Sequence, residues 1–185
     1  MRLLPSVLAV LVLLCASACG SDGKVEVELN GVDRALAPAT IPPDLALHLS
    51  ESPDTRAAFA NASKRTVMAD GLVWEIRRAD RLIGTLQLTT VLSRINLNDP
   101  DTRLGLVNQI LSTTPTSIYV GDAEVYAVQL EGRASFVWFG QGLIEVVQLR
   151  DKQIDEYEKV IQAIVDHQKT QPAWIPLAPP VPKPA

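Results

Sequence analysis

Residues 133–149 read RASFVWFGQGLIEVVQL, and this stretch decides the fold class. It contains two runs rich in β-branched, aromatic and other apolar residues, at 133–139 and 143–149, separated by Gly-Gln-Gly. Glycines between two such runs are typical of a tight hairpin turn. The stretch therefore predicts two neighbouring antiparallel strands.

Similar runs occur on the N-terminal side of this hairpin. Short apolar runs at 117–120 and 124–130 each end at a turn that contains glycine, and a weaker alternation at 45–49 predicts one more strand. Apolar and polar residues also alternate at 72–77 and 82–89 around a short polar link, which predicts a second hairpin. Turns at intervals of about 8–12 residues indicate an antiparallel meander.

Two amphipathic helices complete the predicted domain. Asp99 suits an N-cap and Pro100 the first helical position, and a second helix is predicted over residues 152–169. Strands with one apolar face and two such helices predict an α+β fold, an antiparallel β-meander sheet packed by two helices in a two-layer sandwich. The predicted apolar faces consist of Leu104, Val107, Ile110 and Leu111 in the first helix and Ile154, Tyr157, Val160, Ile161, Ile164 and Val165 in the second.

The N-terminal segment has the pattern of an export signal. Residues 3–14 form an apolar run of 12 residues, which is short for a membrane span of about 20 residues and typical of a signal peptide. Small residues follow as Ala16-Ser17-Ala18, directly before Cys19. We expect residues 1–18 to be removed on export.

This segment resembles the signals of bacterial lipoproteins, in which small residues precede an acylated cysteine. The resemblance covers residues 1–19 and implies that the Cys19 thiol carries diacylglycerol through a thioether. It also implies palmitate labelling and anchoring on the outer face of the cytoplasmic membrane, or on the outer membrane of a cell that has one. The alternative is that Ala-Ser-Ala is a simple cleavage site and Cys19 an incidental residue.

The remaining chain is predicted to have three parts. They are a lipid-anchored tether at 19–43, the α+β domain at 44–170 and a disordered tail at 171–185, which holds 6 of the chain's 13 prolines. The tail is either a disordered segment whose Trp174 and Ile175 pack back on the domain or an extended polyproline ligand for a partner.

Composition excludes several classes of function. The chain has 17 Lys and Arg against 21 Asp and Glu, a net charge of −4, which argues against nucleic-acid binding. Its two cysteines are Cys15, inside the removed signal, and Cys19, so no thiol is left for a disulfide, a thiolate metal site or a nucleophile. The covalent lipid is the only cofactor expected.

No motif predicts catalytic or metal-binding residues. His48 and His167 are expected at the surface or at a helix end, and Glu75 and Glu145 on a solvated face of the sheet. The residues around Asn96 lack the oxygen ligand and the glycine that a calcium loop requires at its fifth and sixth positions.

Phe136 and Trp138 are the most distinctive internal residues. They belong either to a central strand that is buried on both faces or to an apolar groove that binds a lipid or peptide. The favoured function is a non-enzymatic accessory or binding lipoprotein that docks an envelope protein. The alternatives are a carrier of an apolar ligand in a cavity between sheet and helices near Trp138, and, more remotely, a hydrolase with a dispersed site that uses His48 or His167.

Overall fold

A computed structural model describes residues 31–50, 68–130, 132–150 and 154–177 of this chain. The predicted lipid site at Cys19 and the Ala-rich segment around residues 55–63 lie outside the described residues. The elements, in chain order, are η2 (Arg34–Leu36), β1 (Thr40–Ile41), β2 (Leu45–Leu49), β3 (Met68–Arg78), β4 (Arg81–Val91), α3 (Pro100–Leu111), β5 (Thr116–Val120), β6 (Ala123–Leu130), β7 (Arg133–Gly140), β8 (Leu143–Leu149) and α4 (Ile154–Lys169).

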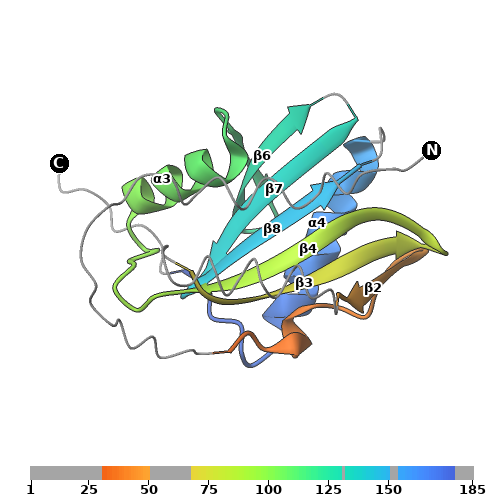
Figure 1. Ribbon diagram of the computed structural model, residues 1–185, viewed down its shortest axis with the longest axis horizontal. Coiled ribbons are helices and arrows are strands. Elements are labelled where there is room, and N and C mark those ends of the chain that lie inside the picture. Colours follow the sequence, from red (N-terminus) through yellow and green to blue (C-terminus); the bar gives the residue numbers. More distant parts are fainter. Residues whose placement is uncertain (1–30, 51–67, 131, 151–153, 178–185) are drawn as a thin grey trace, which may run out of the picture.

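The eight strands form one antiparallel sheet in the order β1-β2-β3-β4-β8-β7-β6-β5 (Figure 1). Each half of the sheet is a meander of four consecutive strands, and the halves meet where β4 pairs with β8. The predicted α+β class, with an antiparallel meander sheet and two helices, is confirmed.

Short turns join the strands where the sequence predicts them. The β3–β4 turn places Ala79 at φ 49°, and glycines supply the positive φ at the three later hairpin turns, Gly121 at 63°, Gly132 at 70° and Gly142 at 73°. A residue without a Cβ adopts this left-handed region at little cost, so the glycines fix the register of the β5–β6 and β7–β8 hairpins. Phe136 is thereby paired with Val147 across the last hairpin.

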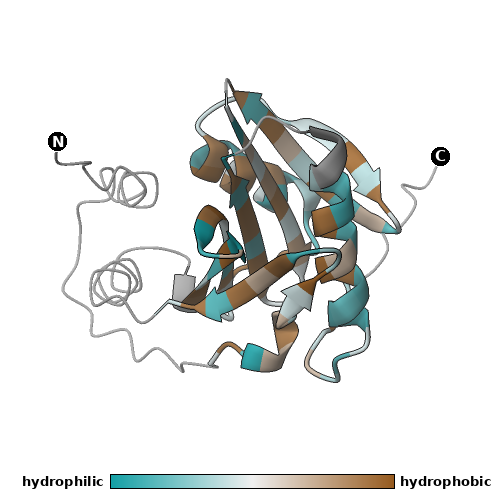
Figure 2. Cartoon of the chain, turned by 90° about the vertical axis from the view of Figure 1, so that its right-hand side faces the viewer, coloured by the Kyte–Doolittle hydropathy of each residue, from teal (hydrophilic) through white to brown (hydrophobic). Residues whose placement is uncertain are grey.

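Helix α4 covers one face of the sheet and contacts β1 and β5, the strands at its two edges. Ile161 and Ile164 of the helix are fully buried against that face. Figure 2 shows hydrophobic residues along the strands beneath the helix and hydrophilic residues on its outer side. The sheet residues of this core include Leu47, Ile76, Leu86, Phe136, Trp138, Val147 and Leu149.

Helix α3 packs on the opposite face, over β6, β7 and β8 (Figure 1). Leu106, Val107 and Ile110 of the helix meet Val137 and Ile144 of the sheet there. The two helices therefore lie on different faces with the sheet between them, in three layers and not in the predicted two-layer sandwich. The amphipathic patterns show that each helix has a buried side but do not determine which face of the sheet it covers. Strand β7 is buried on both sides, in agreement with one of the two interpretations of its aromatic run.

The buried face of α3 includes Val107 and Ile110, as predicted, but differs in the residues beside them. Leu104 is 45% exposed, whereas Arg103 and Leu106 are buried. Asp99 caps the helix as predicted, because its side chain accepts hydrogen bonds from the backbone N–H groups of Asp101 and Thr102. These bonds and the neighbouring Arg103 lower the pKa of Asp99, the largest contribution coming from the Thr102 hydroxyl.

The folded domain is longer at both ends than the sequence predicts. Leu36 and Ile41, which the prediction assigns to the tether, are buried at 3% and 1% exposure beneath α4. At the other end, residues 171–177 of the predicted tail lie on the domain, while 178–185 are outside the described residues. None of the helices in the described ranges is long and apolar enough to span a bilayer.

Candidate binding cleft

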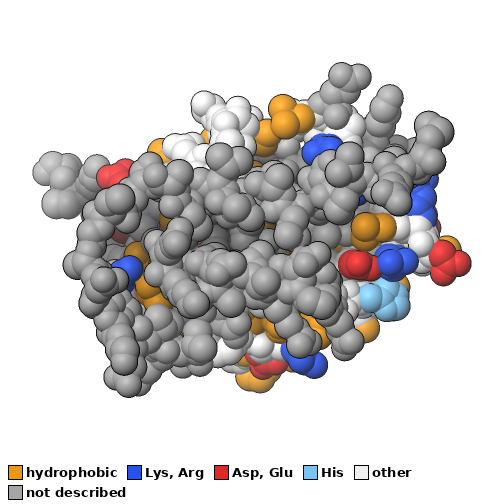
Figure 3. Space-filling model, in the orientation of Figure 1, with side chains coloured by type: hydrophobic (Ala, Val, Ile, Leu, Met, Phe, Trp, Pro, Cys, Tyr) orange, Lys and Arg blue, Asp and Glu red, His pale blue; other side chains and the backbone are white. Residues whose placement is uncertain are grey.

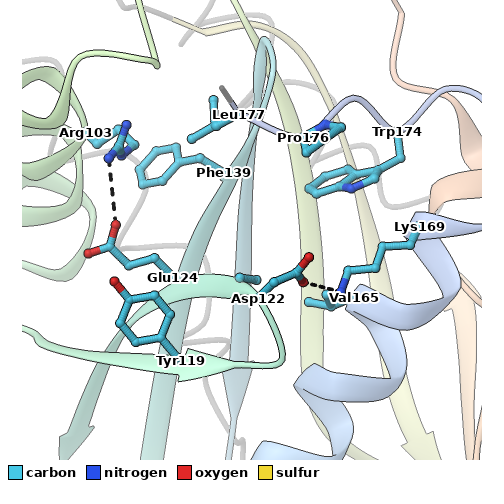
Figure 4. Close-up of a pocket in the computed structure, with 11 residues that line it drawn as sticks. Arg103, Tyr119, Asp122, Glu124, Phe139, Val165, Lys169, Trp174, Pro176 and Leu177 are labelled. Atoms are coloured by element: carbon cyan, nitrogen blue, oxygen red, sulfur yellow. Dashed lines mark hydrogen bonds and ion pairs between the residues drawn. The ribbon is translucent and has the colours of Figure 1, made fainter. Parts of the chain in front are cut away.

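A cleft of about 500 Å³ opens between the two helices at one end of the sheet (Figure 4). Helix α3 and Tyr119 form one wall, and the C-terminal end of α4 and the segment after it form the other. The β5–β6 turn lies between them. The lining residues are Arg103, Tyr119, Asp122, Ala123, Glu124, Phe139, Val165, Lys169, Trp174, Pro176 and Leu177.

The segment after α4 builds the apolar part of the cleft. It turns back through a hydrogen bond from Trp174 N–H to the Gln171 carbonyl, and the Gln141 N–H then donates to the Ile175 carbonyl at 2.8 Å. The Trp174 ring lies over Gly140, where an added Cβ would be 2.6 Å from the ring. We call residues 170–177 the strap. The glycine at the end of β7 leaves room for the strap to pass over this end of the strand, which brings Trp174 near Phe139.

Two ion pairs stand at the sides of the cleft (Figure 4). Arg103 of α3 faces Glu124 with 3.7 Å between Nη2 and Oε2, and Lys169 of α4 is paired with Asp122. Both acids come from the β5–β6 hairpin and both bases from helices. The Lys169 ammonium lowers the pKa of Asp122, chiefly through their hydrogen bond.

Arg103 is held more firmly than the other charged residues of the cleft. Its Nη1 donates to the backbone carbonyls of Leu97 at 2.9 Å and Asn98 at 3.3 Å. The residue is only 9% exposed. Burial raises the pKa of Tyr126, whose hydroxyl lies beside this guanidinium. The loop before α3 thus fixes a cation with part of its hydrogen-bonding capacity directed at the cleft.

A second polar cluster lies inside the core. Glu145 of β8 and Gln168 of α4 are both 0% exposed, and the Gln168 amide donates to Glu145 at 2.5 Å. Trp138 is the cross-strand neighbour of Glu145. Burial raises the pKa of Glu145 to about 8, and the N–H groups of Gln168 and of the nearby Trp138 act in the opposite direction. The expectation of a solvated Glu145 is wrong.

The candidate ligand-lining residues Phe136 and Trp138 lie in the closed core beneath α4. Phe136 packs edge-on against Tyr157 with ring centroids 6.0 Å apart. Neither residue lines the cleft or either of two other hollows on the described surface. Phe139, on the other face of the same strand, lines the cleft instead.

The remaining residues singled out in the sequence are separate from the cleft. His167 Nε2 lies 2.8 Å from the Ala35 carbonyl, and His48 is exposed on β2 opposite Glu75. Glu75 is paired with Arg77 at 2.7 Å. No cluster of three potential metal-binding residues occurs within the described ranges, and the aspartate at 99 serves as a helix cap.

The sequence indicates the positions of some residues of the cleft and of the buried polar cluster, but not of others. Arg103 precedes Leu106 and Val107 by three and four positions, a helical spacing that puts it on the buried face. Glu145 likewise has apolar Leu143 and Val147 two positions away, on the same face of its strand.

Lys169 and Asp122 are 47 residues apart, and no local pattern in the sequence predicts that they form an ion pair.

Searches against protein families, curated proteins and solved structures found no match to this chain.

Proposed function

We propose that this chain is a lipid-anchored lipoprotein of the bacterial envelope that acts as a non-enzymatic binding protein, with the cleft between α3 and α4 as its binding site. The observation that carries the binding function is the combination of an aromatic and aliphatic wall with charged groups in one open cleft. Ligand sites of proteins are typically concave, largely apolar and supplied with a few polar groups that fix orientation.

The anchor is supported by the sequence around Cys19. An apolar run of signal-peptide length leads to small residues and then to this cysteine, as in bacterial lipoproteins. Diacylation would supply stable membrane attachment, because a single acyl chain gives only marginal binding. Twelve residues lead from Cys19 to Gly31, the first described residue, which limits the tether to roughly 40 Å when fully extended.

The tether would join the domain at the same end as the cleft. A second hollow at this end is lined by Gly31 and the loop at 92–98, and it shares Leu177 with the cleft. A domain tethered through Gly31 would therefore keep the cleft within a few tens of ångströms of the bilayer surface. Molecules that belong to the envelope would be its accessible ligands.

Replacement of Cys19 tests the anchor. We expect Cys19→Ala to abolish incorporation of radiolabelled palmitate and to release the protein from membranes. Cys15→Ala is the matched control, because Cys15 lies inside the predicted signal and should leave labelling unchanged. Undiminished labelling of the Cys19 variant would refute the lipoprotein assignment.

Native mass spectrometry of the protein extracted from its own envelope tests the binding function. We expect a bound small molecule that is lost in Trp174→Ala, because Trp174 forms one wall of the cleft. A protein that carries no ligand, and that binds none when apolar and charged small molecules are added, would contradict it. An apolar-ligand carrier, the alternative function, would also use this cleft, since Phe136 and Trp138 are enclosed by the core.

A further inference from the structure

We infer that the cleft is built for an anionic amphiphile, a carboxylate or phosphate group on an apolar body. Arg103 and Lys169, on the two sides of the cleft, supply the positive charge that attracts the acidic group, and Phe139, Trp174 and Leu177 receive the apolar part. This inference rests on the proposed function, because it assumes that the cleft is a binding site, and it adds the chemical class of the ligand.

Arg103 is held more firmly than Glu124, and Lys169 is less exposed than Asp122. Arg103 has a side chain 10% exposed and is bound to two backbone carbonyls, whereas the Glu124 side chain is 35% exposed. On the other side, the Lys169 side chain is 37% exposed and that of Asp122 is 78% exposed. The acids can therefore turn out into water, while the guanidinium stays at the cleft.

The contact between Arg103 and Glu124 is also incomplete. At 3.7 Å it is too long for a hydrogen bond, and Glu124 Oε1 already accepts one from the Ser117 hydroxyl at 3.0 Å. An arriving carboxylate or phosphate can form charge-assisted hydrogen bonds with the guanidinium while Glu124 keeps its Ser117 partner. A cationic ligand would instead lie beside a buried arginine that cannot withdraw.

The apolar wall gives the rest of the ligand a place next to the charged groups. Figure 4 shows Phe139 beside Arg103 on one side of the cleft and Trp174 beside Lys169 on the other. A volume of about 500 Å³ is within the range that holds small organic ligands. The arrangement fits one acidic group at the rim and a short alkyl or aromatic body inside.

Four ligands with the same chain and different head groups test this inference. Octanoate, octyl phosphate, octylammonium and octanol are titrated by calorimetry into the full chain carrying Cys19→Ala, which lacks the acyl site. We expect the two anions to bind at least ~10-fold more tightly than octanol, because only they gain charge-assisted hydrogen bonds, and octylammonium to bind most weakly. Equal binding of all four would overturn the inference but leave the binding function intact, whereas no binding would contradict both.

Matched variants assign the effect to the cleft. Lys169→Met should weaken the anions several-fold without changing octanol, and Lys159→Met, an exposed site on the same helix, should match the parent chain. Glu124→Gln should tighten anion binding, because it removes the carboxylate that competes for Arg103 while keeping an acceptor for Ser117. Anion binding unchanged or weakened by Glu124→Gln would overturn the role of Arg103.

Vesicles distinguish a lipid head group from a free anion. The same chain is sedimented with phosphatidylcholine vesicles that contain or lack phosphatidylglycerol. Co-sedimentation that needs phosphatidylglycerol and is reduced by Lys169→Met supports a lipid head group as the source of the anion. Binding of octyl phosphate or octanoate without such co-sedimentation supports a free anion, and failure of both arms overturns the inference.

Discussion

Glu145 is a buried acid whose carboxyl group is influenced by neutral partners, Gln168 and Trp138. One oxygen of Glu145 and the Oε1 of Gln168 have no hydrogen-bond partner among the described residues. Turning the Gln168 amide over would let a protonated Glu145 donate its O–H to Oε1, and 2.5 Å is a normal distance for an O–H donor. The geometry and the raised pKa both favour the neutral acid at pH 7.

Stability should therefore fall as pH rises from about 4.5 to about 8. In this interval folded Glu145 keeps a proton that the unfolded chain loses, so the unfolded state binds fewer protons and the free energy of unfolding decreases with pH. Above about 8 this contribution is constant. We expect a slope of as much as about 1.4 kcal/mol per pH unit in its steepest part, measured by urea denaturation at a series of pH values.

Two variants isolate Glu145 from the other groups that titrate in this range. Glu145→Gln keeps the shape and hydrogen-bonding capacity of the neutral acid, so its stability should no longer fall with pH between these limits. Glu158→Gln removes an exposed carboxyl from α4 and should retain the dependence of the parent chain. An equal slope in the Glu145 variant and the parent would rule out this assignment.

The surroundings of a single residue are hardest to predict when its contacting residues are distant in the sequence. The sequence predicts the strand at β8 but assigns its single Glu to a solvated face of the sheet. Its burial depends on Gln168, which α4 brings over the strand. Phe136 and Trp138 were placed correctly on one face of β7, yet only the strap at Trp174 determines that the cleft forms beside Phe139.

At the scale of one element, the sequence predicts the ends of α3 better than it predicts which side of the helix is buried. Its start at Asp99 and its end follow from capping residues and from a left-handed Ser112 with φ 54°. Its predicted buried face is correct at Val107 and Ile110 but wrong at Leu104, because several neighbouring residues are apolar and allow more than one buried face. Arg103 is tolerated on that face because two carbonyls of the preceding loop accept its hydrogen bonds.

Two leucines of α3 test the observed face. Leu106 is 7% exposed and Leu104 is 45% exposed. We expect Leu106→Ala to lower the free energy of unfolding by about 2–5 kcal/mol, because it leaves a cavity against the sheet. Leu104→Ala should change it by less than about 0.5 kcal/mol. Urea denaturation of both variants decides between the two faces, and a larger loss for Leu104→Ala would favour the face predicted from sequence.

At the scale of the whole molecule, the sheet depends on one long-range junction. Hairpins between consecutive strands are predictable, since their turns and alternation are local. The pairing of β4 with β8 joins strands separated by α3 and three other strands, and no local pattern specifies it. Helix α4 spans this junction and reaches both edges of the sheet, so its packing favours the observed order.

The surface gives less information than the core about how the molecule is used. Where described residues are visible in Figure 3, acidic and basic side chains are interspersed, and no large patch of one charge gathers on that face. In the cleft, by contrast, two ion pairs lie beside an apolar wall, where two helices and one hairpin turn meet. Because these elements come from both faces and from distant parts of the chain, the cleft is a property of the complete fold.

Gly84 provides a test of the junction between the half-sheets. A Cβ at this position of β4 would lie 2.3 Å from the backbone oxygen of Gln148 and 2.7 Å from Leu149 in β8. Because a backbone atom cannot move aside cheaply, Gly84→Ala should push β8 away and lower the free energy of unfolding by at least about 1–3 kcal/mol. It should also weaken ligand binding, since β7 and the strap are connected to β8.

Gly105→Ala is the matched control, because nothing lies within 4 Å of the added Cβ and the site is inside a helix. There alanine should raise stability by about 0.5–1 kcal/mol. Opposite signs for the two glycines, measured by urea denaturation, would support a close approach of β4 and β8. A stabilising Gly84→Ala would mean that the halves do not pair as observed, and the cleft that depends on their order would have to be abandoned as well.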